Sequence, residues 1–413
     1  MRVHVTGIGS IGTLVAFHLR RSNPPPAHAF TLLSRRSNDR RQSAYPQNEQ
    51  DYLFVESDGI RRRIGGFDRE IMDSKREPPR RFVGRDQKTS SQPDMHTASR
   101  TLPTIQSLLV TTKATSAMSA IETLLPRLNA SSTIILLQNG IGVYDHLVEK
   151  LFPDVDSRPN FIIGSVTHGV WAKRPRDVVH ASPGNIQFAL VPDELKRRNF
   201  EQGLVSSPAP DYATYSVDAD ERINSISIAR RREEDPKFYS LAESTRLLLR
   251  AHGDLQTSWV PMDDMQVITR RKLVVNACIG PLTAIGDCPN GALVANPAAY
   301  RIIRSVCAEA ATIYAAQAEE AAAAGRSVSP LWATSLSRKA LEETVHQIIR
   351  STSRNYSSML MDARRGNLTE VEYINGYLTR AGAALGIPAP TNTSLLDLMR
   401  MKRLVPASPA SVT

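Results

Sequence analysis

The chain has 413 residues, of which 41% are hydrophobic, and a formal net charge of +10. This length suits two or three domains with real cores, and the positive charge suits an anionic partner such as a phosphorylated cofactor, a nucleic acid or a membrane surface. No apolar run approaches the ~20 residues that span a bilayer, which argues against a membrane-spanning protein.

The cysteines and the N-terminus predict a cytoplasmic protein. The three cysteines form no CxxC pair and are too few for a disulfide framework. The first residues already read as a strand, so we expect no signal peptide, while a mitochondrial address stays open. The nine histidines show no metal-ligand spacing, so no metal is expected.

Residues 1–34 predict a strand, a tight turn, a helix and a second strand, in "RVHVTG", "IGTLVAFHLRR" and "AFTLLS". Their apolar residues suit buried parallel strands. "YLFVESDGIRRRI" predicts a hairpin that turns at Asp58 and Gly59. Residues 67–104 are polar, basic and without period, so we interpret them as a mobile insertion.

The alternation of strand and helix then resumes with "SLLVTT", a helix over 116–128 and "TIILLQ". A second polar insertion covers about 193–236, and "LAESTRLLLRAHG" with "LQTSWV" predicts one more helix and strand. From 260 onward the chain reads as helical. We therefore expect an α/β fold: a Rossmann-like parallel-sheet domain over 1–259, followed by an all-helical domain over 260–413.

The stretch "GIGSIG" predicts a dinucleotide site because it follows a strand and opens a helix. Gly7 permits the tight turn, Gly9 lets a pyrophosphate approach, and Gly12 lets helix and strand pack closely. Ser10 and Ile11 offer helix N-terminal amides to the phosphates. The alternative is an ordinary glycine-rich turn.

The end of the second strand bears on which nicotinamide cofactor is used. An NAD site usually has an acidic residue there, whereas this chain has Arg35 and Arg36. Arginine suits a 2′-phosphate, so we predict NADP and assign the contact to Arg35. The chain scatters arginines widely and Asp39 lies nearby, so NAD remains the alternative.

Several polar residues stand where catalysis or binding would need them. Lys113 and Asn139 each follow a predicted strand, and ligands of such sheets bind beyond the carboxyl ends of strands. Lys272 and Asn276 share one face of an apolar helix, which is costly unless something polar meets them. Further candidates towards the C-terminus are Asn290, Asn355, Ser358 and Glu370.

The chain resembles the ketopantoate reductase (2-dehydropantoate 2-reductase) family. The matching stretches are "GIGSIG", "TKA", "QNGIG", "RKLVVNACIGPLTAIGDCPNGAL", "SSML-D", "TEVEYINGYL" and "GIPAPTNTSLLDLM". The resemblance implies NADPH-dependent reduction of 2-dehydropantoate to (R)-pantoate, a step in pantothenate and coenzyme A synthesis. The implied partner is a small 2-keto acid; we expect no membrane or nucleic-acid partner, and either a monomer or a homodimer.

The resemblance also implies roles for single residues. Lys272 matches the general acid, Lys113 assists near the reacting carbonyl and also lies at the cofactor, and Glu370 hydrogen-bonds the substrate. Asn139 lies by the cofactor and the substrate. The residues that match substrate-holding positions are Asn276, Asn290, Asn355 and Ser358.

The implied chemistry explains a lysine on an apolar helix. Hydride attack on a 2-keto group develops negative charge on its oxygen, and an ammonium group stabilises that charge and supplies a proton. We expect burial and nearby cations to lower the pKa of Lys272.

Each assignment has a simpler alternative. Lys272 could be a surface lysine, and Glu370 could merely favour a helix dipole, with Glu372 as the competing carboxylate. Asn290 could be a turn former and Ser358 a surface hydroxyl. His168 is expected to be structural.

Two departures from the family pattern affect the expected substrate. Many members carry a third asparagine where this chain has Gly280, and Pro281 next to it is expected to kink the helix. The two polar insertions are the second departure. A reductase of another branched 2-keto acid and a catalytically silent relative that binds RNA or a protein are therefore the alternatives.

Overall fold

The computed structural model describes residues 1–26, 28–35, 49, 51–72, 80–82, 103–193 and 235–404. The chain divides into two compact units. Unit 1 comprises Met1–Gln138 and Asp145–Met262, and unit 2 comprises Asn139–Tyr144 and Asp263–Thr413. The predicted boundary at 259/260 lies close to the observed one, but the short segment after Gln138 groups with unit 2.

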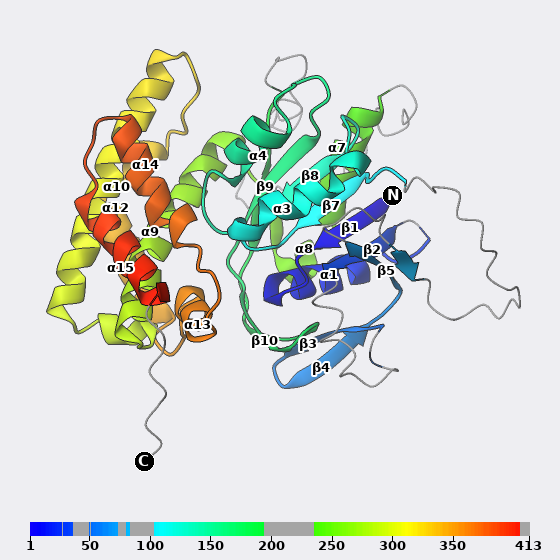
Figure 1. Cartoon of the computed structure of the whole chain (residues 1–413), viewed down its shortest axis with the longest axis horizontal. Helices are drawn as coiled ribbons and strands as arrows, with labels where there is room; N and C mark the ends of the chain where they lie inside the picture. The colour runs from blue at the N-terminus through cyan, green and yellow to red at the C-terminus, as the bar shows by residue number, and fades with distance from the viewer. Residues whose placement is uncertain are drawn as a thin grey trace, which may run out of the picture. The chain divides into compact units, whose positions relative to one another are not determined.

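Unit 1 is built on a mostly parallel sheet, which confirms the predicted fold class (Figure 1). Among the described residues its strand order is β13-β12-β9-β8-β7-β1-β2-β5-β6, with antiparallel pairing only for β9/β12 and β5/β6. The strands are β1 (Arg2–Thr6), β2 (Ala29–Arg35), β5 (Phe67–Met72), β6 (Arg80–Phe82), β7 (Ser107–Val110), β8 (Thr133–Leu136), β9 (Asn160–Val166), β12 (Ile186–Leu190) and β13 (Thr257–Trp259).

A second, four-stranded sheet in unit 1 has the order β10-β11-β3-β4. It consists of β3 (Leu53–Ser57), β4 (Ile60–Ile64), β10 (Gly169–Arg174) and β11 (Asp177–Ser182). The predicted hairpin is confirmed as β3–β4, and Asp58 and Gly59 both have positive φ, of 53° and 75°. This is the turn chemistry that a two-residue hairpin loop requires.

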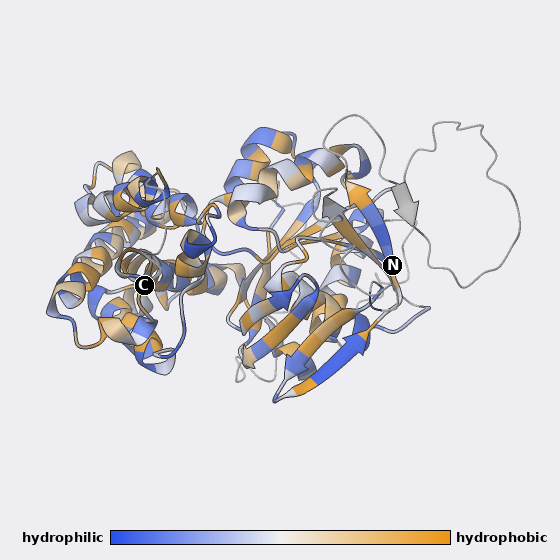
Figure 2. Ribbon diagram, turned by 60° about the horizontal axis from the view of Figure 1, so that its bottom comes forward, coloured by the Kyte–Doolittle hydropathy of each residue, from blue (hydrophilic) through white to orange (hydrophobic). Residues whose placement is uncertain are grey.

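Helix α1 (Ser10–Ser22) contacts strands of both sheets in unit 1. Its residues from Gly12 to Leu19 are buried, and it shares one apolar core with α7 (Pro236–Leu249) and α8 (His252–Leu255). Hydrophobic residues run along the strands that this core covers (Figure 2). The other helical elements in the described part of unit 1 are α3 (Ala114–Leu124) and η2 (Leu125–Arg127), and α4 (Val143–Leu151) begins in unit 2 and continues in unit 1.

The described part of unit 2 is helical, as predicted. Its longest elements are α9 (Met262–Gly286) and α10 (Pro297–Ala323), which meet in the second apolar core. The remaining elements are η4 (Asn290–Leu293), α11 (Trp332–Ser335), α12 (Arg338–Ser351), α13 (Ser358–Arg364), η5 (Val371–Tyr373), α14 (Asn375–Ala384) and α15 (Pro390–Leu404). None of the helices in the described ranges has the length and apolar character needed to cross a membrane.

The predicted start of the first insertion is wrong. Residues 67–72 form β5, which pairs parallel with β2, and the side chain of Glu70 is buried. Its charge is accommodated because Arg127 donates to Glu70 Oε2 at 2.6 Å. The buried ion pair therefore allows this polar stretch to form a strand. The pattern of apolar residues in the sequence does not predict it. We expect mobility in residues 73–79, 83–102 and 194–234, and these residues lie outside the part of the chain that the structure describes.

Candidate active site

The glycine turn between β1 and α1 leaves no room for side chains at two positions. Gly7 has φ +91°, and a Cβ there would lie 2.2 Å from the backbone nitrogen of Thr112. A Cβ on Gly12 would lie 2.2 Å from the carbonyl oxygen of Gly7. Thr111, a residue that the sequence did not single out, fixes the turn by donating from Oγ1 to Gly7 O at 2.9 Å.

The N-terminus of α1 has the features of an anion site. Gly9 occupies the N-cap without a side-chain hydrogen bond, and the first turn, which includes Ser10 and Ile11, contains no acidic residue. A Cβ on Gly9 would meet nothing closer than 3.9 Å, so this side of the turn is open. The first amides of a helix lack partners within it and carry the positive end of its dipole. A dinucleotide pyrophosphate therefore fits this turn.

The residues predicted to distinguish NADP from NAD are only partly described. Arg35 is the last residue of β2, and its backbone pairs with Met72 of β5. The side chain of Arg35, together with Arg36 and Asp39, lies outside the described residues. The preference for NADP therefore stays a prediction.

Lys113 lies beyond the carboxyl end of β7, as predicted. It occupies the N-cap position of α3 with extended backbone angles and is half-buried. Its neighbour Thr112 accepts a hydrogen bond from Gln138 Nε2 at 3.3 Å, which links the turn after β7 to the end of β8.

Lys272 and Asn276 lie one turn apart on α9, and both are half-buried among buried neighbours such as Leu273 and Val274. Burial lowers the pKa of Lys272 from its ordinary value of 10.5 to about 8, although the Glu370 carboxylate opposes this shift. The amine is thus neither a surface lysine nor an isolated charge. It can give up a proton near neutral pH, which a general acid must do.

Glu370 and Asn139 lie together within unit 2. Asn139 Nδ2 donates to Glu370 Oε2 at 3.3 Å, and Glu370 is close enough to Lys272 to raise its pKa. Glu370 precedes η5 but makes no side-chain capping bond there. The competing carboxylate, Glu372, instead pairs with both ends of the Arg400 guanidinium, at 2.8 and 2.9 Å. Glu370 is therefore the carboxylate that belongs with Lys272.

The other predicted substrate residues form a second group. Asn290 is buried, and its Nδ2 donates to Thr352 Oγ1 at 2.9 Å. Its backbone nitrogen donates to the carbonyl oxygen of Asn355 at 2.9 Å, so these two predicted residues are adjacent. Asn355 and Ser358 are exposed, and Ser358 is the first residue of α13. The side-chain amide of Asn290 thus serves the fold, which agrees in part with its reading as a turn residue.

Two residues that the sequence did not single out lie against α9. Met359 covers Gly280: a Cβ on Gly280 would lie 3.0 Å from Met359 Cε. A thioether therefore occupies the place where many family members were expected to carry a third asparagine. Ser357 lies 2.7 Å, oxygen to oxygen, from Thr283 of α9 while capping α13. No sequence pattern reveals such contacts between residues distant in the chain.

His168 is a structural residue in unit 1. Its Nε2 lies 3.0 Å from the carbonyl oxygen of Leu255 and its Nδ1 lies 3.0 Å from His180 Nε2. The described residues contain no group of three or more His, Cys, Asp or Glu side chains that could hold a metal ion.

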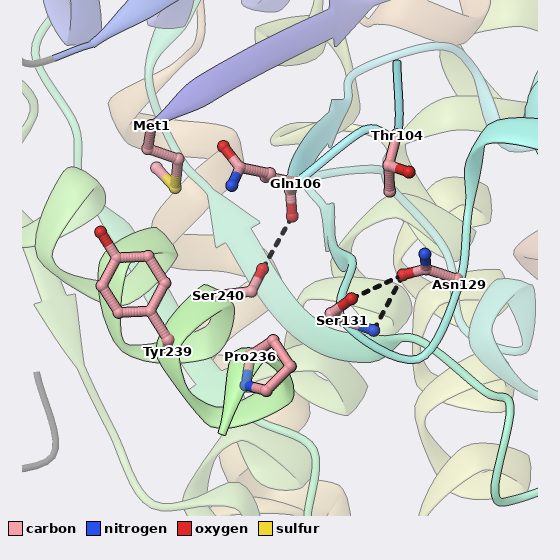
Figure 3. Close-up of a pocket in the computed structure, with 8 residues that line it drawn as sticks. All are labelled: Met1, Thr104, Gln106, Asn129, Ser131, Pro236, Tyr239 and Ser240. Carbon is pink, nitrogen blue, oxygen red and sulfur yellow. Dashed lines mark hydrogen bonds between the residues drawn. The ribbon is translucent and has the colours of Figure 1, made fainter. Parts of the chain in front are cut away.

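A separate pocket in unit 1 contains none of the predicted site residues (Figure 3). It lies beside residues that precede β1, β7 and β8, namely the amino ends of these strands. Two pairs of its lining residues bond to one another: Ser240 donates to Gln106 O at 2.8 Å, and Ser131 Oγ donates to Asn129 Oδ1 at 2.8 Å. Ligands of parallel sheets bind at the opposite, carboxyl ends, where the glycine turn lies.

Two family models match the chain. Residues 75–193 match "Ketopantoate reductase PanE/ApbA", and residues 264–403 match "Ketopantoate reductase PanE/ApbA C terminal". Together the two matches cover more than half of the chain. The second match contains Lys272, Asn276 and Glu370.

Curated relatives carry the corresponding name. The probable 2-dehydropantoate 2-reductase of Schizosaccharomyces pombe is 25% identical over 97% of this chain and 96% of its own length. The 2-dehydropantoate 2-reductase of Shigella flexneri is 28% identical over 76% of this chain and 78% of its own length.

Solved structures share the fold at low identity. A probable 2-dehydropantoate 2-reductase from Bacillus subtilis has a TM-score of 0.59 and 22% identity over 97% of this chain and all (100%) of its own. The D-mandelate dehydrogenase solved with NADH and anilino(oxo)acetate has a TM-score of 0.63 and 15% identity over 98% of each chain.

Proposed function

Because the chain belongs to the ketopantoate reductase family of oxidoreductases, we propose that it reduces 2-dehydropantoate to (R)-pantoate with NADPH. The observation that carries this proposal is the placement of Lys272, Glu370 and Asn139 within unit 2. A half-buried amine with a lowered pKa lies near a carboxylate, and an amide donates to that carboxylate at 3.3 Å. The reaction would supply pantothenate and coenzyme A synthesis, and a cytoplasmic location remains our prediction.

The glycine turn supports the nicotinamide cofactor. Gly7, Gly9, Ser10, Ile11 and Gly12 would hold the pyrophosphate against the N-terminus of α1. When bound, the nicotinamide supplies the hydride for C2 of the substrate. We assign the 2′-phosphate of NADPH to Arg35, and a position near the cofactor to Lys113 and Asn139.

The chain's own residues would handle the proton and the substrate. Lys272 would hold its proton at Nζ, stabilise the negative charge that develops on the keto oxygen, and then donate the proton. Glu370 would accept a hydrogen bond from the terminal hydroxyl of the substrate. Asn276, Asn290, Asn355 and Ser358 would hold the remaining polar groups of the keto acid, and Lys113 would assist near its carbonyl.

The Gly280–Met359 contact favours a second candidate substrate. It replaces an amide by an apolar group on the face of Lys272 and Asn276. The chain could therefore act on another branched 2-keto acid, such as 2-ketoisovalerate, which lacks the terminal hydroxyl.

A panel of 2-keto acids tests the proposal. We would follow oxidation of NADPH and of NADH with 2-dehydropantoate and 2-ketoisovalerate, using wild type and Glu370→Ala. A site built to bind a hydroxyl rejects the analogue without it by up to ~10⁴-fold. We expect wild type to prefer 2-dehydropantoate and Glu370→Ala to narrow that preference. Equal kcat/KM for both acids in wild type would move the assignment to the broader 2-keto acid class, and no turnover of either would favour a silent relative.

A further inference from the structure

In helix α9, the backbone carbonyl of Ala277, one residue after Asn276, lacks its usual hydrogen-bond donor. In a helix, the carbonyl oxygen of Ala277 would accept from the backbone nitrogen of residue 281. That residue is Pro281, which has no amide hydrogen and lies within the helix. The carbonyl of Ala277 therefore loses its regular helical donor in a buried environment, and such a loss is costly unless another donor replaces it.

Asn375, at the start of α14, provides the replacement. Its Nδ2 donates to Ala277 O at 3.1 Å, across 98 positions of sequence, and its side chain is fully buried, with 0% exposed. The same nitrogen donates its second hydrogen to Asn392 Oδ1 at 3.1 Å. One side-chain amide thus substitutes for the proline's missing donor.

The side-chain amide of Asn375 is held in place by its hydrogen bond to Asn392. Asn392, on α15, is fully buried and donates from Nδ2 to Glu309 Oε2 at 2.8 Å. Glu309, on α10, also accepts from the backbone nitrogens of Thr391 and Asn392, at 2.7 and 3.1 Å. The network therefore runs from α10 through α15 and α14 to α9, and it ends beside the face that carries Lys272 and Asn276.

The position of Asn375 in the chain gives the contact a consequence for the site. Asn375 and Glu370 are joined by a short segment whose only helical element is η5. The bond to Ala277 ties this segment to α9, while Asn139 contacts it at Glu370. A movement of 1 Å at a reacting group can cost about 100-fold in rate.

We propose that Asn375 is a positioning residue that holds Glu370 at its working distance from Lys272 by bonding the carbonyl freed by Pro281. The expected effect on catalysis rests on the proposed function. The positioning of Glu370 relative to Lys272 does not depend on it. Because its side chain is fully buried, Asn375 would act through α9 and the Glu370 segment and not by direct contact with a ligand.

A measurement of the Lys272 pKa tests the proposal without any substrate. Competitive acylation with acetic anhydride over a pH series, read by peptide mass spectrometry, reports the pKa of this single amine. In wild type we expect about 8. Asn375→Leu keeps the side-chain size and removes the donor, so the Glu370 segment is released and the Lys272 pKa should fall towards its value in Glu370→Gln.

The matched control is Asn392→Leu, which removes an equally buried amide one step farther from α9. It should lower the melting temperature as Asn375→Leu does, yet lower the Lys272 pKa less, because Asn375 keeps its donor to Ala277 O even without the support of Asn392. An unchanged or raised pKa in Asn375→Leu, or equal shifts in both variants, would overturn the proposal and leave Asn375 a purely structural residue.

Pro281→Ala separates the two consequences of losing the Asn375 donor. Alanine restores a backbone donor to Ala277 O, so Asn375→Leu should lower the melting temperature less in that background than alone. The Glu370 segment stays untied from α9 in the double variant, so the Lys272 pKa should fall as far as it does in Asn375→Leu. In the kinetic assay we expect Asn375→Leu to lower kcat by about 10–100-fold in both backgrounds. A Lys272 pKa that returns to the wild-type value in the double variant would contradict the proposal.

The tests also separate the two proposals. If Asn375→Leu alone does not fold, the double variant with Pro281→Ala is used for the labelling experiment: a lowered Lys272 pKa supports the role, and a pKa at the wild-type value overturns it. If wild type reduces no 2-keto acid, the proposed function fails, but the labelling experiment still decides whether Asn375 sets the environment of Lys272.

Discussion

At Lys272, burial and charge act on the same amine in opposite directions. Desolvation disfavours the ammonium form and Glu370 favours it, and the result is a pKa of about 8. A lysine at its ordinary pKa would stay protonated near neutral pH and would be a weak acid. The half-buried position on α9 would therefore make Lys272 a better proton donor than a solvent-exposed position would.

Replacing Lys272 by alanine should lower kcat by roughly 10²–10⁴-fold, the usual range for general acid–base catalysis. Binding of NADPH should change little, because we assign the cofactor's pyrophosphate to the glycine turn and its 2′-phosphate to Arg35, and not to Lys272. The matched control is Arg271→Ala, which removes an exposed cation from the next position of α9. Near-normal turnover in the Lys272 variant would remove this residue from the mechanism.

Replacing Arg35 by alanine tests the cofactor prediction. Loss of a charge-assisted hydrogen bond is worth on the order of 1.5–3 kcal/mol, or about 10–150-fold in affinity. The variant should bind NADPH more weakly and NADH almost unchanged, as measured by titrating fluorescence of each reduced cofactor. Equal losses for both would show that Arg35 does not contact the 2′-phosphate.

At the scale of elements, the glycines in the turn between β1 and α1 differ in whether the fold requires them. Gly7 and Gly12 are required by the protein itself, since a Cβ on either would lie 2.2 Å from backbone atoms. Gly9 is not required in this way, because its Cβ would meet nothing within 3.9 Å. The open space at Gly9 would admit the pyrophosphate of the proposed cofactor.

Two alanine substitutions distinguish the glycine needed for folding from the glycine needed for cofactor binding. Gly9→Ala should melt within a degree or two of wild type, roughly the effect of an unstrained surface change, and yet bind NADPH much more weakly. Gly7→Ala should lower the melting temperature as well, because φ +91° and the contact with Thr112 are both unfavourable for alanine. If Gly9→Ala binds the cofactor normally, the nucleotide does not lie against this turn.

The sequence identified these elements where the pattern is local. The glycine turn, the β3–β4 hairpin and the apolar face of α9 follow from spacing and periodicity. The contacts that complete the site do not, because Asn375 meets Ala277 across 98 positions and Met359 meets Gly280 across the helix interface. Likewise, β5 was missed because Glu70 is buried through its partner Arg127, and a polar strand carries no apolar alternation.

At the scale of the whole molecule, unit 1 buries several histidines in their neutral form. Burial lowers the pKa of His18, His28, His168 and His180. Burial, followed by the charge of Arg127, lowers the pKa of His4 from 6.5 to about 3. On unfolding these groups return to their ordinary pKa. For His4, between about pH 6.5 and 3 the unfolded state binds a proton that the folded state does not, so stability falls as pH falls through this range.

His4→Gln should flatten this acid dependence. A group whose pKa moves from 6.5 to about 3 makes the protein lose about 2 kcal/mol of unfolding free energy between pH 7 and pH 5. Urea unfolding at the two pH values measures the loss in wild type and in the variant. The loss should be smaller in the variant by about that amount. The same loss in both proteins would mean that His4 does not titrate as described.

The most direct test of the central claim is the pH dependence of kcat/KM for 2-dehydropantoate reduction, because it reports the acid of the free enzyme. If Lys272 is the general acid, kcat/KM should be level at lower pH and should fall as pH rises through about 8. In Glu370→Gln the charge that raises this pKa is gone, so the fall should move to lower pH. A profile without a fall near pH 8, or one that Glu370→Gln leaves in place, would contradict the account.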